Sequence, residues 1–216
     1  MKIYPAILES DRDLVEEKIT LVKDLVERVQ LDVIDGLFAD NLTVTPEDVA
    51  KIDWGDLGVD VHLMVDDPME WIEACLSLPK VRIIAQVERL GSQSVFVDWV
   101  RGYREVEGIG LGLDKDTPIE ALDKEVLDQV SVVVLLAVRA GFQGQVFDEK
   151  VKVKIKQLRK IFNGEIVIDG GVGISNIKQL EELKVDGVAI GSYLWQSKDV
   201  RKQLIKLRER VTNNEK

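Results

Sequence analysis

Short apolar runs alternate along the chain with segments in which apolar residues recur every three or four positions, the spacing of an amphipathic helix. The first run covers residues 3–8, and the helical pattern behind it can be capped by Ser10 or Asp11. Because helical segments separate the apolar runs, we expect a parallel sheet covered by helices. The further strands are predicted at residues 29–34, 59–65, 81–87, 109–113, 130–138, 165–168 and 185–190.

Eight strand and helix units indicate an α/β protein, and their number predicts a single (β/α)8 TIM barrel. An open, doubly wound sheet is the alternative that the same alternation allows. Among the helices we expect residues 92–104, a segment that starts at Pro118, and residues 148–162. The chain has 216 residues, 45% of them hydrophobic, which suits one domain over residues 1–216 with a frayed tail at 212–216.

Composition narrows the classes of partner. A formal net charge of -10 argues against a general nucleic-acid or anionic-membrane binder, so a small ligand is expected. A single cysteine, Cys75, excludes an internal disulfide and a cysteine-rich zinc site. The start of the chain does not resemble a signal peptide, and no apolar run is long enough to span a bilayer, so we expect a cytoplasmic protein. The sequence is compatible with a homo-oligomer. We expect the four tryptophans to lie in the core rather than at an interface between subunits: Trp54, Trp71, Trp99 and Trp195.

The second predicted strand carries a carboxylate among apolar residues. Alternation places Gln30, Asp32 and Ile34 on one face of this strand. An unpaired carboxylate in a core costs several kcal/mol of stability, so Asp32 needs a cation, an ion pair or a hydrogen bond. From this stretch alone, Asp32 is either a strand-end residue held by a neighbouring loop or a functional group.

Glycines follow the last three predicted strands. In a TIM barrel the active site lies at the carboxyl ends of the strands, and the loops after the last two commonly hold a phosphate. Backbone amides of glycines, which no side chain covers, can together form an anion-binding site when their loops are neighbours; we call such a site a glycine nest. Arg139, just before the first of these loops, either adds a contact to an anion or is a solvated charge. We therefore predict phosphate binding by Gly141, Gly144, Gly170, Gly171, Gly191 and Ser192.

Five motifs occur in order along nearly the whole chain. They are Tyr4-Pro5-Ala6-Ile7-Leu8, Leu31-Asp32-Val33-Ile34-Asp35-Gly36, Asp60-Val61-His62-Leu63-Met64-Val65, Gly141-Phe142-Gln143-Gly144-Gln145 and Asp169-Gly170-Gly171. By these motifs the chain resembles the ribulose-phosphate 3-epimerase family. The resemblance implies a (β/α)8 barrel, a phosphorylated ketopentose as ligand, and a divalent metal held by two histidines and two aspartates. It also implies inversion of the third carbon of the sugar through an enediolate.

This chemistry requires particular groups. Inverting a carbon next to a carbonyl removes a proton from one face and returns one to the other, so two acid/base groups must flank the substrate. The resemblance assigns these roles to Asp32 and Asp169, which end different predicted strands. A cation beside the enediolate oxygens supplies charge stabilisation, and the only histidine, His62, matches one metal ligand. The other interpretation of His62 is a core histidine bonded to a carbonyl.

The chain departs from the family pattern at the metal site. Gln30 stands where the family has its second histidine ligand, and Ala6 where it has a serine. The expected metal site is therefore Asp32, His62 and Asp169, with Gln30 as a weak fourth ligand. Such an oxygen-rich site binds zinc, iron or cobalt less well, which favours manganese, magnesium or no metal. Met64 remains where the family has a methionine in the substrate site, whereas Ile34 and Leu136 replace methionines and Gln86 replaces a common histidine.

Three functions are compatible with this pattern. The first is an epimerase of a sugar phosphate with an altered metal site, which the retention of both aspartates favours. The second is a catalytically silent relative that binds a sugar phosphate. The third is a metal-independent barrel enzyme, such as a lyase or decarboxylase, acting on another phosphorylated substrate. The loss of a histidine and a serine favours the last two.

Overall fold

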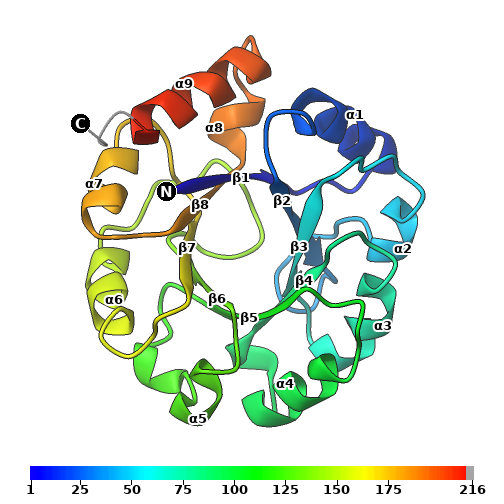
Figure 1. Ribbon diagram of the computed structural model, residues 1–216, viewed down its shortest axis with the longest axis vertical. Coiled ribbons are helices and arrows are strands. Elements are labelled where there is room, and N and C mark those ends of the chain that lie inside the picture. Colours follow the sequence, from blue (N-terminus) through cyan, green and yellow to red (C-terminus); the bar gives the residue numbers. More distant parts are fainter. Residues whose placement is uncertain (213–216) are drawn as a thin grey trace.

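The computed structural model describes residues 1–212, and its eight parallel strands form a closed barrel in the order of the chain (Figure 1). The last strand pairs with the first, with Ile3 opposite Val188. This closure confirms the TIM barrel and excludes the open sheet. The strands are β1 (Lys2–Ile7), β2 (Arg28–Ile34), β3 (Gly58–Met64), β4 (Arg82–Gln86), β5 (Gly108–Leu113), β6 (Val132–Leu136), β7 (Glu165–Asp169) and β8 (Gly187–Ile190).

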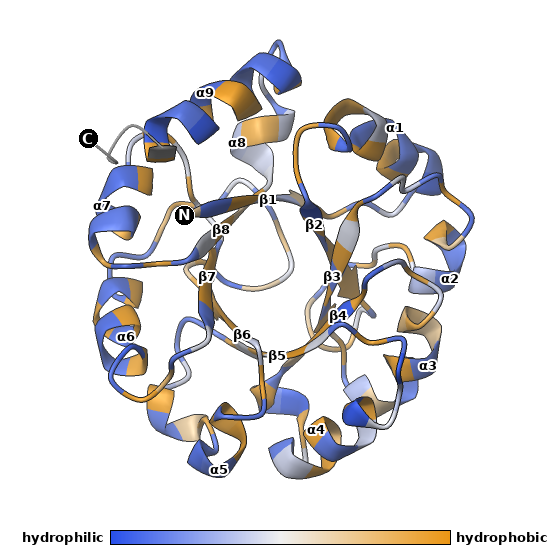
Figure 2. Ribbon diagram, in the orientation of Figure 1, coloured by the Kyte–Doolittle hydropathy of each residue, from blue (hydrophilic) through white to orange (hydrophobic). Residues whose placement is uncertain are grey.

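Helices surround the barrel, and their hydrophobic residues lie mainly on the sides facing the strands (Figure 2). None of the helices in the described part of the chain combines the length and apolar character needed to cross a membrane. The α-helices are α1 (Arg12–Val22), α2 (Pro46–Val49), α3 (Ile72–Cys75), α4 (Gln93–Arg101), α5 (Lys124–Leu127), α6 (Val151–Leu158), α7 (Ile177–Glu182), α8 (Ser192–Trp195) and α9 (Val200–Thr212).

Several helices are shorter than the sequence pattern predicted. The segments at 92–104 and 148–162 contain helices only at Gln93–Arg101 and Val151–Leu158. The helix predicted from Pro118 is divided into a 3-10 turn and α5, because Leu122 between them has an extended backbone. Of the tail predicted at 212–216, Thr212 is the last residue of α9, and residues 213–216 lie outside the described part of the chain.

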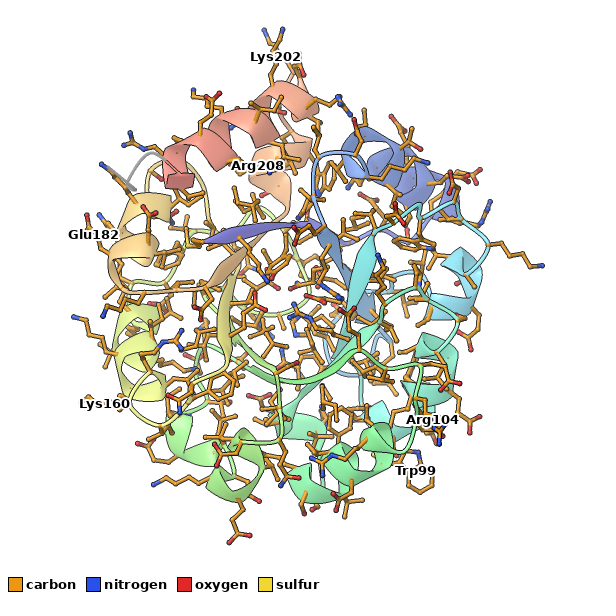
Figure 3. The ribbon with its side chains drawn as sticks, viewed as in Figure 1. Trp99, Arg104, Lys160, Glu182, Lys202 and Arg208 are labelled. Atoms are coloured by element: carbon orange, nitrogen blue, oxygen red, sulfur yellow. The ribbon has the colours of Figure 1, made fainter. Side chains whose placement is uncertain are left out.

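The tryptophans do not all lie in the core. Trp54 is buried, and Trp71 and Trp195 pack partly buried against the core. Trp99 points outward from α4 and is 55% exposed, so its predicted core position is wrong (Figure 3). The reason is its place on the helix: Phe96, Val97 and Val100 form the buried face of α4, and Trp99 lies at the edge of this face, where its ring is largely exposed.

The barrel interior is filled by side chains that cross from one strand to its neighbours. The glycines of β5 lie against side chains of the neighbouring strands: a Cβ on Gly110 would lie 2.7 Å from both Ile84 and Val132. A Cβ on Gly112 would lie 2.9 Å from Gln86. The missing side chains of β5 therefore make room for the large residues of β4.

Replacing Gly110 with alanine is expected to destabilise the protein by about 1–3 kcal/mol, since an added methyl group overpacks the barrel interior. Urea unfolding measures this difference. Gly91→Ala is the matched control, because a Cβ at this exposed position has no atom within 4 Å. We expect the control to change stability by less than about 0.5 kcal/mol, and equal effects of the two changes would contradict the packing explanation.

A buried ion network closes the amino-terminal end of the barrel. The Nε of Arg82 donates to Asp60 Oδ1 at 2.7 Å, and its Nη1 donates to Glu165 Oε2 at 2.6 Å. Arg28 Nη1 also donates to Asp60 Oδ1, at 2.9 Å, and the Tyr4 hydroxyl donates to Glu165. The network joins strands β1, β2, β3, β4 and β7 and leaves the other end of the barrel for the site described next.

Candidate active site

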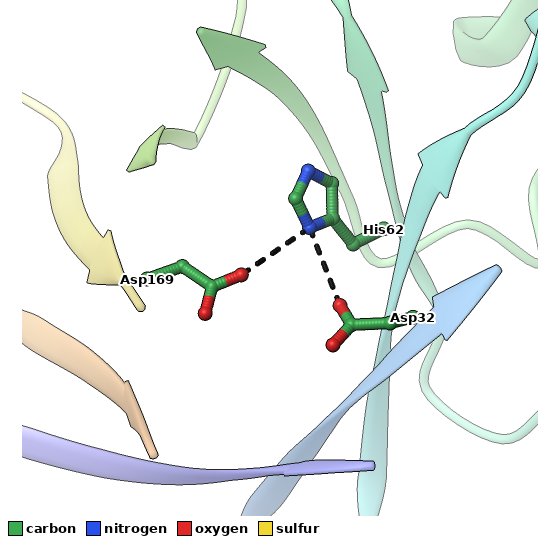
Figure 4. Close-up of side chains that lie close together, drawn as sticks. All are labelled: Asp32, His62 and Asp169. Atoms are coloured by element: carbon green, nitrogen blue, oxygen red, sulfur yellow. Dashed lines mark ion pairs between the residues drawn. The ribbon is translucent and has the colours of Figure 1, made fainter. Parts of the chain in front are cut away.

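Three of the predicted site residues meet at the carboxyl ends of the strands. Asp32 and His62 are opposite each other in the register of β2 and β3, and Asp169 is the last residue of β7. The Nδ1 atom of His62 lies 3.3 Å from Asp32 Oδ1 and 3.6 Å from Asp169 Oδ2 (Figure 4). Their potential ligand atoms all lie within 4.8 Å of one another. The fold thus brings the two predicted acid/base groups together beside the single histidine.

Gln30 lies at the centre of this group. Its Nε2 atom donates to Asp32 Oδ1 at 2.8 Å and to Asp169 Oδ2 at 2.7 Å, and it lies 3.5 Å from His62 Nδ1. Gln30 reaches the site because it shares the inner face of β2 with Asp32, as the alternation predicted. The prediction of Gln30 as a weak ligand requires its amide oxygen, whereas the amide nitrogen faces the carboxylates here.

Burial and charge set the protonation of the group. Burial raises the pKa of Asp32 to about 6, and the negative charge of Asp169 adds to the rise, while His62 and Gln30 oppose it. Burial lowers the pKa of His62, but hydrogen bonds to and charges of Asp169 and Asp32 outweigh it and raise this pKa to about 9. Near neutral pH, His62 therefore holds its proton and Asp32 is close to its titration range, which suits proton transfer.

Gln86 contacts the far side of the imidazole. Its Nε2 lies 2.9 Å from His62 Nε2. Since an amide nitrogen only donates, this orientation of the amide would require a neutral imidazole that accepts at Nε2, whereas the raised pKa of His62 indicates an imidazolium with a proton on each nitrogen. The Oε1 of Gln86 is buried and has no hydrogen-bond partner within the described chain. A half-turn of the amide would pair this oxygen with the Nε2 proton of a charged imidazolium, and Nδ1 would keep its proton.

The glycine-rich loops border a pocket beside the acidic pair. Gly170 and Gly171 have φ angles of 102° and 65°, a region that favours glycine. A Cβ on Gly171 would lie 2.5 Å from the backbone nitrogen of Phe147, so the loops after β6 and β7 touch there. This one pocket is lined by Asp32 and Asp169, by Met64, and by all the predicted phosphate-binding residues: Gly141, Gly144, Gly170, Gly171, Gly191 and Ser192.

Two further residues at the pocket, Gln143 and Arg139, bear on the sequence analysis. Gln143 was not predicted to contribute, yet its Nε2 donates to the carbonyl of Ala6 at 3.3 Å and lies over Gly191. Its place in the motif of residues 141–145, one of the five that carry the resemblance, was the signal in the sequence. Arg139 also lines the pocket while remaining exposed, so its contact with an anion remains a prediction.

The long loop after β2 is fixed to its neighbours by polar contacts. Asp35 Oδ1 accepts from the backbone nitrogens of Leu37 and Phe38 at 2.8 and 3.0 Å, and its Oδ2 accepts from that of Asp66 at 2.7 Å. Asn41 Nδ2 donates to the carbonyl of Gly141 at 2.7 Å. The loop after β2 is thereby joined to the loops after β3 and β6 at the mouth of the barrel.

Comparisons with known proteins point to one family. The sequence model of the Ribulose-phosphate 3 epimerase family matches residues 2–195. The ribulose-phosphate 3-epimerase of Helicobacter pylori strain J99 is 32% identical over 92% of this chain and 93% of its own. That of Bacillus subtilis is 27% identical over 96% and 98%.

Solved structures share the fold at low sequence identity. A 3-hexulose-6-phosphate synthase superposes with a TM-score of 0.72 at 13% identity, covering 98% of this chain and 100% of the other. An orotidine 5'-phosphate decarboxylase from Pyrococcus horikoshii OT3 gives a TM-score of 0.66 at 12% identity, covering 97% and 99%. At this level of identity the likeness concerns the barrel alone.

Proposed function

Since the chain belongs to the ribulose-phosphate 3-epimerase family, we propose that it inverts the third carbon of a phosphorylated ketopentose. One observation carries the proposal: Asp32 and Asp169, from β2 and β7, converge on the same amide nitrogen at 2.8 and 2.7 Å. Two carboxylates beside one pocket are the minimum that a two-sided proton transfer needs. The chain is accordingly an epimerase acting on carbohydrate phosphates.

The proposed reaction uses the two carboxyl groups in turn. One aspartate, ionised, takes the proton from the third carbon; the electron pair of that C–H bond forms a double bond to the carbonyl carbon, and the π pair of the carbonyl moves to its oxygen to give an enediolate. The other aspartate, protonated, gives its proton to the opposite face of the same carbon as the carbonyl re-forms. The pKa of about 6 at Asp32 allows this group to serve in either state near neutral pH.

The glycine nest would hold the phosphate of the substrate. Backbone amides at Gly170, Gly171 and Gly191 adjoin the acidic pair in the same pocket. An anchored phosphate would fix the sugar so that its third carbon lies between the two carboxyl groups. Met64 lines the same pocket and would contact the sugar.

The resemblance implies a divalent cation, which when bound would neutralise charge on the enediolate oxygens. Asp32, His62 and Asp169 would hold it, and the spacing of their ligand atoms suits a single ion. The fourth position does not fit, because Gln30 presents a hydrogen-bond donor to the two carboxylates. Proton removal and return at the third carbon both use the two carboxyl groups alone.

The proposal is tested by proton exchange in deuterated water. Ribulose 5-phosphate is incubated with the protein, alone and with Mn²⁺, Zn²⁺ or Fe²⁺, and the proton on the third carbon is followed by NMR. We expect loss of that signal and formation of the epimer. Thermal stabilisation by ribulose 5-phosphate without exchange under any of these conditions would instead support the silent binding protein.

A further inference from the structure

We propose that the side-chain amide of Gln30 takes the place of a divalent cation in this chain, so that Asp32 and Asp169 are held ready for proton transfer without a metal. The inference rests on the proposed epimerase function and concerns how its acid/base pair is assembled. It assigns Gln30 as a positioning residue, acting through the two aspartates.

The hydrogen-bonding capacity of the amide matches this role. An amide nitrogen carries two hydrogens, and Gln30 Nε2 has two acceptors, one from each aspartate, at 2.8 and 2.7 Å. Hydrogen bonds to a charged acceptor are stronger than those between neutral groups. Both donors are thus used to join two carboxyl groups, which repel each other whenever both are ionised.

The amide and a cation would compete for the same space. A cation bound by Asp32, His62 and Asp169 lies about 2.0–2.2 Å from each ligand atom. Gln30 Nε2 lies between these same atoms, 2.7 to 3.5 Å from each of them. Because Gln30 is only 1% exposed, a displaced amide could not simply move into solvent.

A second departure from the family pattern lies beside Gln30. On β1, Ala6 is the partner of Gln30 in the register with β2. These two departures, Ala6 and Gln30, are therefore neighbours, and the small side chain of Ala6 leaves space for the longer one of Gln30.

The test measures metal binding and exchange separately. The protein is treated with EDTA and titrated with Mn²⁺, and free Mn²⁺ is followed by electron paramagnetic resonance. We expect no stoichiometric Mn²⁺ binding by the wild type and unchanged exchange of the third-carbon proton in EDTA. Gln30→His, which removes the bridging amide and adds a ligand nitrogen, is expected to bind one Mn²⁺ per chain and to show exchange that EDTA abolishes.

Two further variants complete the test. Gln30→Leu fills similar space without donors, and we expect metal-free exchange to fall by about a hundredfold or more while the far-UV spectrum is unchanged. Gln157→His makes the same substitution as the histidine variant at an exposed position of α6, and we expect neither Mn²⁺ binding nor exchange to change. If Gln30→Leu does not fold, the Mn²⁺ titrations of the wild type and Gln30→His still decide the question.

The possible failures are distinguishable. A wild type that binds one Mn²⁺ per chain, loses exchange in EDTA and regains it with Mn²⁺ would overturn the role of Gln30 and leave the epimerase function standing. Absence of exchange from the wild type and from Gln30→His, with and without metal, would overturn the function itself.

Discussion

Asp169→Asn is expected to reduce exchange of the third-carbon proton of ribulose 5-phosphate by about a thousandfold or more. An asparagine can accept the hydrogen bond from Gln30 Nε2 that Asp169 accepts at 2.7 Å, but it cannot take up or release a proton under these conditions. General acid/base catalysis by one group contributes about 10²–10⁴-fold, and here one face of the carbon would lose its only partner. The rate of deuterium incorporation, measured by NMR, gives the size of the loss.

The control for this change is Asp98→Asn, on the exposed side of α4, where the aspartate side chain is 73% exposed. We expect its exchange rate to equal that of the wild type. Asp32→Asn should repeat the loss seen with Asp169→Asn, because the second face needs its own group. A variant at either site that retained more than about a tenth of the wild-type rate would remove that aspartate from the acid/base pair.

The fold and the residues at the centre of the site could be predicted from local sequence patterns and from the family resemblance. Alternating strands and helices predicted the barrel, because each element is set by residues close in sequence. The apolar strand around Asp32 indicated a carboxylate in need of a partner, and its period of two placed Gln30 on the same face. His62 and Asp169 followed from the resemblance, and the closed barrel brings all of them to one place.

Contacts between distant strands could not be read in this way. The two acceptors of Gln30 are Asp32, on its own strand, and Asp169, which is 139 residues away. The sequence specified an amide at this position but not whether its oxygen or its nitrogen would face the carboxylates. Only the arrangement of both acceptors around one point decides this, because two carboxylates select the donor end.

The ion network at the other end of the barrel was missed for the same reason. Asp60 and Arg82 each lie in predicted apolar strands, and neither neighbourhood in the sequence contains the partner. Their pairing appears only when β3 and β4 are aligned, where Asp60 stands opposite Arg82. Gly108 of β5 then gives the arginine side chain its space, which a local pattern does not specify.

Arg82→Met is expected to lower the free energy of unfolding by about 3–5 kcal/mol, because it leaves buried carboxylates without their cation. Methionine fills much of the volume, so lost charge pairing, rather than a cavity, dominates the effect. Asp60 is 2% exposed and would retain Arg28 as its remaining arginine partner, whereas Glu165 would keep only the hydroxyl of Tyr4 within this network. Urea unfolding at neutral pH measures the difference, with the exposed Arg101→Met on α4 as a control expected to cost less than about 1 kcal/mol.

The pH dependence of the stability difference between Arg82→Met and the wild type shows whether lost charge pairing or lost packing causes the destabilisation. Burial raises the pKa of Glu165, but the charge of Arg82 and hydrogen bonds from Tyr4 and Arg82 bring it below its usual value. In the wild type this lowered pKa contributes stability that is lost as the pH falls through the folded-state pKa. Without Arg82 the buried carboxyl binds its proton more readily than in the unfolded chain, so the variant gains relative stability on acidification. The difference between the two proteins should therefore narrow from neutral pH to about pH 4, and a constant difference would indicate that packing, not the buried charge, accounts for the loss.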